Sequence, residues 1–133
     1  MSKILIIEDS QPFISLLTKK LILAGFDCEF ILQSGNLTRE EVADQILGKA
    51  PDLIILDLNM PGAGGIAVLE ELRFREKELN LGSIPVIILT ALDADKRDIE
   101  YLKLNAQVAE FVQKPLQDFT AFISLIKKYN KNV

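Results

Sequence analysis

The chain has 133 residues, 49% of them hydrophobic and 26% charged, and a formal net charge of −4, which predicts one domain over residues 1–133. The negative charge without a basic stripe argues against direct nucleic-acid binding, and the apolar runs are too short for insertion into a membrane. Histidine is absent and Cys28 is the only cysteine, which excludes histidine-based zinc sites and an internal disulfide and favours a cytoplasmic protein.

The first predicted elements are a buried strand and an amphipathic helix. Residues 3–9 form a β-branched apolar run that ends in acids, which is typical of a buried strand. Ser10 is the expected N-cap of the helix, and Gly25 is expected to end it. Apolar positions recur in this helix at helical spacing, at Phe13, Leu16, Leu17, Leu21 and Ala24.

A second strand, a capped helix and a third strand are predicted next. Residues 27–33 have the composition of a strand. Thr38 and Glu41 form the pattern of a capping box, which opens a helix that stops near Pro51. Residues 52–58 predict the third strand.

The same alternation continues to the end of the chain. A glycine-rich loop precedes a helix whose expected core face includes Ile66, and residues 85–90 predict the fourth strand. A helix from about residue 95 to 104 follows, with Asn105 as its expected left-handed cap, and then a strand at 109–113. The last helix is amphipathic, with apolar residues at Phe119, Phe122, Ile123 and Ile126.

Strands that alternate with helices predict right-handed crossovers and an α/β fold with five parallel strands and helices on both faces, (βα)₅. The continuous apolar runs in several strands agree with a sheet that is buried on both sides. A small basic run at Arg73, Arg75 and Lys77 is typical of a solvated helix face.

Reactive polar groups stand where the predicted strands end. Glu8 and Asp9 end the first strand, Asp57 the third, Thr90 the fourth and Lys114 the fifth. Ligands of open parallel sheets bind outside the carboxyl ends of the strands, so these groups are expected to converge. Clustered carboxylates favour a divalent cation, and hard oxygen ligands suit Mg²⁺.

The same group of residues predicts phosphoryl chemistry. Asp57 beside a metal can act as a nucleophile and form an acyl phosphate. Thr90 can donate a hydrogen bond to one phosphoryl oxygen, and Lys114 can pair with another. A lone threonine at a strand end is usually a β-former, so these assignments depend on the convergence of all the groups.

Together these motifs resemble the receiver (response regulator) domain of two-component signalling systems, over essentially the whole chain. The resemblance rests on the acidic pair Glu8-Asp9, on Asp57 within Asp-Leu-Asn-Met-Pro-Gly, on Thr90 within Leu-Thr-Ala and on Lys114 before a proline. It implies the flavodoxin-like doubly wound sheet of order 2-1-3-4-5.

The resemblance implies that Asp57 is the phosphoacceptor. It also implies that Glu8, Asp9 and Asp57 bind Mg²⁺, with the backbone carbonyl of Asn59 as a further ligand, and Mn²⁺ is the alternative ion. No organic cofactor is implied. Asn59 and Leu92 occupy positions that modulate the lifetime of the phosphoryl group in this family.

The resemblance also implies how the phosphoryl group is sensed. Thr90 and Lys114 would contact it, and Phe111 would act with Thr90 as the switch. The bond between Lys114 and Pro115 would be cis, as is usual in the family.

By the same resemblance the protein is a signalling domain that catalyses only its own phosphoryl transfer and dephosphorylation. Its donor would be a histidine kinase or a histidine phosphotransfer protein. Its output would be a partner protein bound by the face of the fourth helix, the fifth strand and the last helix.

Three other functions are alternatives for a chain with these motifs. A haloacid-dehalogenase-like phosphatase also uses a strand-end aspartate, but it needs a second acid two residues later, where this chain has Asn59. A flavodoxin-like electron carrier needs a first loop that cradles a phosphate, which Glu8 and Asp9 would repel. A docking receiver without phosphorylation is disfavoured by the complete set of site residues.

Overall fold

Five parallel strands form one sheet, in the order β2-β1-β3-β4-β5, in the computed structural model, which describes residues 2–91 and 96–130. The predicted strand order is therefore confirmed, although each predicted strand extends past the observed one. The strands are β1 (Lys3–Glu8), β2 (Asp27–Leu32), β3 (Leu53–Leu56), β4 (Val86–Thr90) and β5 (Glu110–Gln113).

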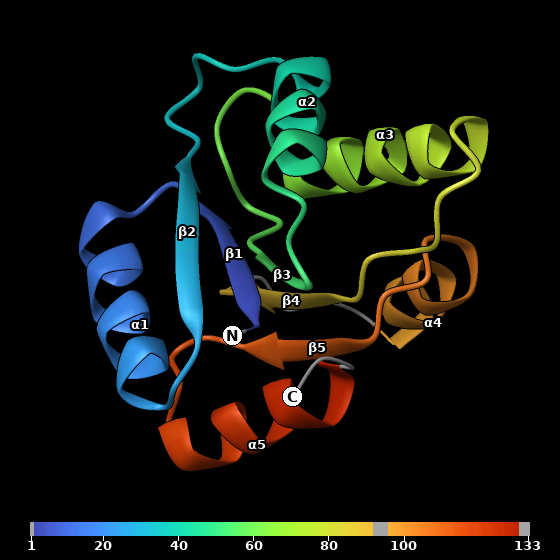
Figure 1. Cartoon of the computed structure of the whole chain (residues 1–133). Coiled ribbons are helices and arrows are strands. Elements are labelled where there is room, and N and C mark those ends of the chain that lie inside the picture. Colours follow the sequence, from blue (N-terminus) through green and yellow to red (C-terminus); the bar gives the residue numbers. More distant parts are fainter. Residues whose placement is uncertain (1, 92–95, 131–133) are drawn as a thin grey trace.

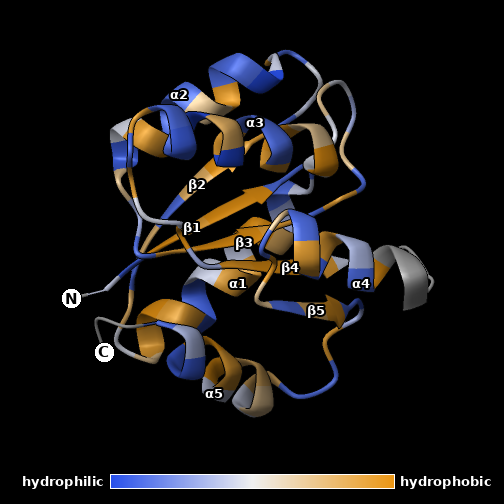
Figure 2. Ribbon diagram, turned by 90° about the vertical axis from the view of Figure 1, so that its right-hand side faces the viewer, coloured by the Kyte–Doolittle hydropathy of each residue, from blue (hydrophilic) through white to orange (hydrophobic). Residues whose placement is uncertain are grey.

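Helices cover both faces of the sheet, as Figure 1 shows. They are α1 (Gln11–Leu23), α2 (Arg39–Lys49), α3 (Gly65–Glu78), α4 (Lys96–Asn105) and α5 (Phe119–Tyr129). The α1 and α5 helices lie on one face, and α2, α3 and α4 lie on the other (Figures 1 and 2). Within the described ranges, none of the helices has the length and apolarity that crossing a membrane requires.

The central strands β1, β3 and β4 are hydrophobic over most of their length (Figure 2), and their two faces contribute to separate cores. In β1, Leu5 and Ile7 pack toward α2 and α3, whereas Ile4 and Ile6 pack toward α1 and α5. All four side chains are buried. This alternation along a strand with two buried faces explains the continuous apolar run in the sequence.

Local sequence signals set the helix ends. The Ser10 side chain accepts a hydrogen bond from the backbone N–H of Phe13 and caps α1. The capping box of Thr38 and Glu41 is present at α2, with both hydrogen bonds formed. Gly25 follows the end of α1 with a φ of 97°, a conformation that glycine adopts without strain.

Two residues predicted for the core face of a helix are exposed instead. Leu16 is 45% exposed and Ile66 is 46% exposed. The buried stripe of α1 runs through Ile14, Leu17 and Leu21, and Leu16 lies about 100° around the helix from Leu17. The stripe of α3 begins one residue before Ile66, so Ile66 is turned away from the core.

The end of α4 differs from the prediction. Gln107, not Asn105, has the positive φ, of 55°. Asn105 is still helical, and its side-chain amide donates to the carbonyl of Tyr101 at 3.0 Å. The N–H of Ala106 continues the helical pattern by bonding to the carbonyl of Leu102 at 2.9 Å, so the left-handed residue is Gln107, two positions after Asn105.

The predicted solvated basic run is wrong for Arg73, which ties α3 to two loops. Its guanidinium donates to Glu76 at 2.7 Å, to the carbonyl of Ile84 at 2.9 Å and to the carbonyl of Ala106 at 2.8 Å. Glu76 is 2% exposed and accepts the N–H of Ile84 at 2.8 Å. This buried ion pair therefore joins the end of α3 to the segments that lead into β4 and β5.

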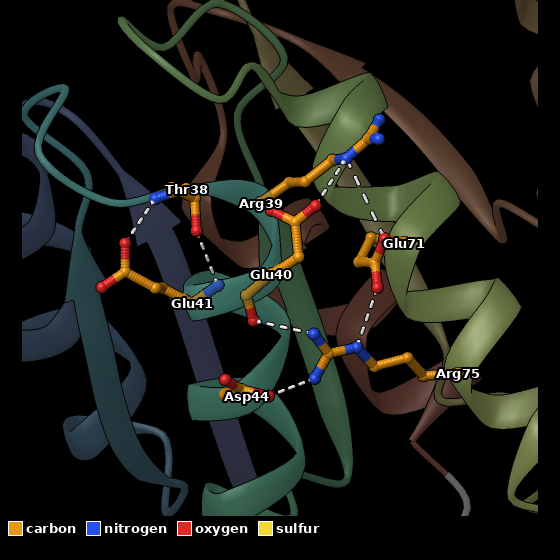
Figure 3. A network of polar contacts seen from close by, with 7 residues as sticks. All are labelled: Thr38, Arg39, Glu40, Glu41, Asp44, Glu71 and Arg75. Atoms are coloured by element: carbon orange, nitrogen blue, oxygen red, sulfur yellow. Dashed lines mark hydrogen bonds and ion pairs between the residues drawn. The ribbon is translucent and has the colours of Figure 1, made fainter.

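Arg75 is the centre of a polar network between α2 and α3 (Figure 3). Its guanidinium pairs with Asp44, donates to the carbonyl of Glu40 at 3.2 Å and binds Glu71 at 2.9 Å. Arg39 adds a contact with Glu71 at 3.9 Å. The network joins the polar faces of the two helices above their shared apolar core.

Candidate functional site

Three carboxylates meet at the carboxyl edge of the sheet. Glu8 ends β1, Asp9 follows it, and Asp57 directly follows β3, which pairs with β1. Each offers an oxygen, and these oxygens all lie within 4.8 Å of one another. Glu8 and Asp57 are 2% and 4% exposed, whereas Asp9 is exposed. The order of the strands brings together residues that are 48 positions apart in the sequence (9 against 57).

Lys114 extends over this cluster from the end of β5. Its Nζ atom donates to Glu8 Oε2 at 2.6 Å and lies 3.7 Å from Asp57 Oδ2. Its backbone N–H donates to the carbonyl of Thr90 at 2.8 Å, so the ends of β4 and β5 are joined there. Thr90 is buried at the end of β4. The structure thus places the five strand-end residues at one edge.

The remaining predicted residues lie close by. The backbone N–H of Asn59 donates to Asp57 Oδ1 at 3.1 Å. Phe111 is half-buried in β5, pairs in register with Ile88 and packs against the core beneath α2, α3 and α4. The bond between Lys114 and Pro115 is cis. Leu92 lies outside the described residues.

The cluster carries more negative charge than Lys114 can balance. Burial raises the pKa of Glu8 from 4.5 to about 7; the hydrogen bond from Lys114 lowers it, and the neighbouring Asp9 and Asp57 raise it further. A divalent cation would favour the charged carboxylate. Three carboxylate oxygens at this spacing form a donor set that fits Mg²⁺, which prefers a few hard oxygen ligands and keeps several waters.

Gly65 allows α3 to begin directly against the segment that carries Asp57. A Cβ atom at this position would lie 2.4 Å from the Asp57 carbonyl oxygen and 2.6 Å from the Leu58 Cα. The N–H of Gly65 donates to the Leu58 carbonyl at 3.1 Å. The sequence indicated only a glycine-rich loop here, because the close approach depends on the tertiary fold.

The loop after β2 also supports the segment after Asp57. Gln33 is fully buried and accepts hydrogen bonds from the N–H groups of Gly35 and Leu37 while it donates to the Leu37 carbonyl. Gly35 then lies against Gly62, where an added Cβ would be 3.0 Å from its Cα and its carbonyl oxygen. The sequence signal for this loop is a glutamine at the end of a predicted strand, followed two residues later by a glycine.

Phe13 is a further residue at the site. Its ring centroid lies 4.3 Å from the Nζ atom of Lys114. The sequence predicted Phe13 only as an apolar position of the first helix. A pattern of helical spacing cannot indicate that a ring contacts a lysine about 100 residues later.

Comparisons with known proteins agree with this geometry. A family model described as the response regulator receiver domain matches residues 4–127. The chain is similar to the hybrid signal transduction histidine kinase L of Dictyostelium discoideum (30% identity over 99% of this chain). It is also similar to the phosphate regulon transcriptional regulatory protein PhoB of Pseudomonas aeruginosa (32% identity over 84% of this chain). The chain spans 7% and 44% of the lengths of these two relatives, respectively.

Among solved structures, the chain is similar to the response regulator protein TrrA of Thermotoga maritima in complex with Mg²⁺–BeF. The TM-score is 0.76 at 27% identity, and the match covers 97% of this chain and 99% of that one. The strand order and the five helices described above agree with this match.

Proposed function

The chain belongs to the response regulator receiver domain family of two-component signalling, and we propose that Asp57 is its phosphoacceptor. The observation that carries the proposal is the cluster of Glu8, Asp9 and Asp57 within 4.8 Å, with the Lys114 ammonium 3.7 Å from Asp57. We propose that residues 1–133 act as one receiver unit.

In the proposed reaction, a carboxylate oxygen of Asp57 attacks the phosphorus of a phosphohistidine. The bond between phosphorus and the imidazole nitrogen breaks, and the imidazole leaves with its electron pair and takes up a proton. The product is an acyl phosphate on Asp57. The donor is a phosphohistidine on a histidine kinase or a histidine phosphotransfer protein, since this chain contains no histidine.

Glu8, Asp9 and Asp57 would hold Mg²⁺, with the Asn59 carbonyl as a further ligand and Mn²⁺ as the alternative ion. When bound, the ion supplies charge neutralisation at the phosphoryl oxygens. Lys114 pairs with one of these oxygens as a point charge, which requires its ammonium to move from Glu8 toward the new group. The Mg²⁺–BeF complex of the Thermotoga maritima relative supports this assignment.

The proposed output is a change of surface that a partner protein binds. Thr90 donates to the phosphoryl group and moves inward, and the ring of Phe111 follows, which changes the face formed by α4, β5 and α5. The backbone bond between Lys114 and Thr90 links the two strand ends that carry these groups. Asn59 and Leu92 would set the lifetime of the phosphoryl group.

Two observations favour this function over the alternatives. The backbone amides of Asp9 and Ser10 donate to Glu8 Oε1 at 3.1 and 3.3 Å, so they do not form the phosphate cradle that a flavodoxin-like carrier needs. Asn59 contributes a backbone N–H to Asp57, where a haloacid-dehalogenase-like phosphatase would have a second acid.

Intact-mass measurement with acetyl phosphate and Mg²⁺ tests the acceptor. We expect one added phosphoryl group on the wild type and none at this site in Asp57→Asn. The control Asp27→Asn alters an exposed aspartate at the start of β2 and should be phosphorylated like the wild type. Undiminished labelling of Asp57→Asn would refute the assignment.

The metal assignment is tested separately. Asp9 is the exposed member of the cluster, so Asp9→Ala should fold normally, and it should abolish Mg²⁺-dependent phosphorylation. If Asp9→Ala is phosphorylated as fast as the wild type at the same Mg²⁺ concentration, the ion binds elsewhere.

A further inference from the structure

The Lys114 ammonium has an aromatic neighbour in addition to its carboxylates. Its Nζ atom lies 2.6 Å from Glu8, 3.7 Å from Asp57 and 4.3 Å from the centroid of the Phe13 ring. The Lys114 side chain is 17% exposed, so this contact is largely shielded from water. We propose that Phe13 is a positioning residue that holds the Lys114 ammonium at the site through a cation–π contact.

The turn from β1 into α1 places the Glu8 carboxylate and the Phe13 ring together. Glu8 Oε1 accepts the N–H groups of Asp9 and Ser10, which leaves Oε2 for Lys114. The Ser10 hydroxyl then accepts the N–H of Phe13 at 3.3 Å. One chain of hydrogen bonds therefore fixes both groups that contact the ammonium from this side.

The Phe13 ring can hold the Lys114 ammonium in a way that a third carboxylate could not. The face of a phenyl ring attracts a cation, and the attraction strengthens when water is excluded. The ring accepts no proton and carries no net charge, so it orients the ammonium without neutralising it. Lys114 therefore keeps its full charge for a phosphoryl oxygen, and Phe13 would keep it in place while it leaves Glu8.

Phe13 and Lys114 both line an open apolar hollow. This hollow has a volume of about 440 Å³, and its walls include Phe13, Pro115 and Phe119. Without the ring, the lysine side chain would gain room to turn into this space. The effect on phosphorylation rests on the proposed function of Asp57, but the contact between ring and lysine can be measured without it.

A series of fluorinated phenylalanines at position 13 tests the proposal. Site-specific 4-fluoro-, 3,5-difluoro- and 3,4,5-trifluorophenylalanine weaken the attraction of the ring for a cation and change its volume little. The rate of phosphorylation by acetyl phosphate at saturating Mg²⁺ should fall progressively, by about three- to tenfold over the series. Phe13→Tyr should keep a near-normal rate, and Phe13→Leu should fall at least as far as the trifluoro variant.

Phe119 provides the matched control. Its ring lines the same hollow and lies 5.4 Å from the ammonium of Lys20, which is not part of the acid cluster. The same fluorinated series and Phe119→Leu should leave the rate within about twofold of the wild type. A flat series at position 13, or an equal fall at position 119, would show that the ring acts by packing alone and would overturn the proposal.

An NMR measurement without any phosphoryl donor separates this proposal from that of Asp57. The ring current of Phe13 should shift the Lys114 ε-methylene protons upfield, and Phe13→Leu should remove that shift. Unshifted protons in the wild type would overturn the positioning role. If the wild type is not phosphorylated at all, the proposal for Asp57 fails. The positioning role of Phe13 is then judged from the Lys114 resonances alone, which should respond to the fluorinated series.

Discussion

The side chain of Lys114 hydrogen-bonds to that of Glu8 at 2.6 Å, although β3 and β4 lie between their strands in the sheet. The lysine therefore reaches across the end of β3, where Asp57 lies 3.7 Å from its Nζ atom. An ion pair of this kind offsets the cost of burying two charges, and it adds little net stability. Its importance lies in the arrangement that it imposes on the three groups.

The first prediction concerns the pH dependence of stability without a divalent ion. Burial raises the pKa of Glu8 from its ordinary value of 4.5 to about 7. Between these values the folded state binds more protons than the unfolded state, so the free energy of unfolding falls as pH rises. The Glu8 contribution to this fall is on the order of 3 kcal/mol, because one pKa unit corresponds to about 1.4 kcal/mol.

Thermal unfolding at pH 5.5 and pH 8.0 measures this effect. Glu8→Gln should lose less stability over the interval than the wild type, and Glu70→Gln, which changes an exposed acid on α3, should behave as the wild type. Mg²⁺ should stabilise the wild type more at pH 8.0 than at pH 5.5. Equal pH slopes for Glu8→Gln and the wild type would contradict the prediction.

The second prediction concerns Gly65. Its added Cβ would lie 2.4 Å from the Asp57 carbonyl oxygen, so Gly65→Ala must displace either α3 or the segment that carries Asp57. We expect Gly65→Ala to destabilise the fold by about 2–4 kcal/mol in urea denaturation. Gly48→Ala is the matched control, because it lies in α2 with no heavy atom within 4 Å of the added Cβ. It should raise stability by roughly 0.5–1 kcal/mol.

The third prediction concerns the ion pair of Arg73 and Glu76. Their side chains are 12% and 3% exposed, so the loss of one partner leaves a buried charge unpaired. Arg73→Met should lower the free energy of unfolding by about 3 kcal/mol. Lys77→Met, at an exposed position of the same helix, should change it by less than about 0.5 kcal/mol.

A double-mutant cycle separates the ion pair from the backbone contacts of Arg73. Arg73→Met combined with Glu76→Gln should cost less than the sum of the two single changes, because neither variant group then needs a charged partner. Strict additivity would mean that the bonds to the Ile84 and Ala106 carbonyls account for the effect.

Sequence reasoning was most effective where one topological rule applied to many residues. Parallel strands present their carboxyl ends at one edge, so Glu8, Asp57 and Lys114 were expected together without any knowledge of distances. The sequence was least informative about contacts that depend on tertiary approach. The charge of Arg73 predicts a solvated side chain, but its partners include carbonyl groups more than ten residues away, which the local sequence does not indicate.

The position of the left-handed residue after α4 also depends on a tertiary contact that the sequence does not indicate. Asn105 was expected there because asparagine tolerates a positive φ better than most residues. The guanidinium of Arg73, however, donates to the carbonyls of Ala106 at 2.8 Å and Gln107 at 3.3 Å, and the positive φ falls at Gln107. The preference of asparagine for a positive φ, a fraction of a kcal/mol, is outweighed by these two hydrogen bonds, of which the one to Ala106 is partly buried.

The last prediction concerns the switch. Thr90 and Lys114 are joined by a backbone hydrogen bond, and Phe111 lies three residues before Lys114 on β5. Beryllofluoride, which mimics an acyl phosphate, should draw the Thr90 and Lys114 side chains toward Asp57 and so disturb β5 and its neighbours. A differential stabilisation of about 1.4 kcal/mol between two packings gives a tenfold shift in population.

With Mg²⁺ and beryllofluoride, amide resonances of residues about 90–116 should therefore shift more than those of α2. Thr90→Ala should reduce the shifts around Phe111 while beryllofluoride still binds near Asp57. A response confined to α2, or one that is absent away from Asp57, would exclude the face of α4, β5 and α5 as the output surface.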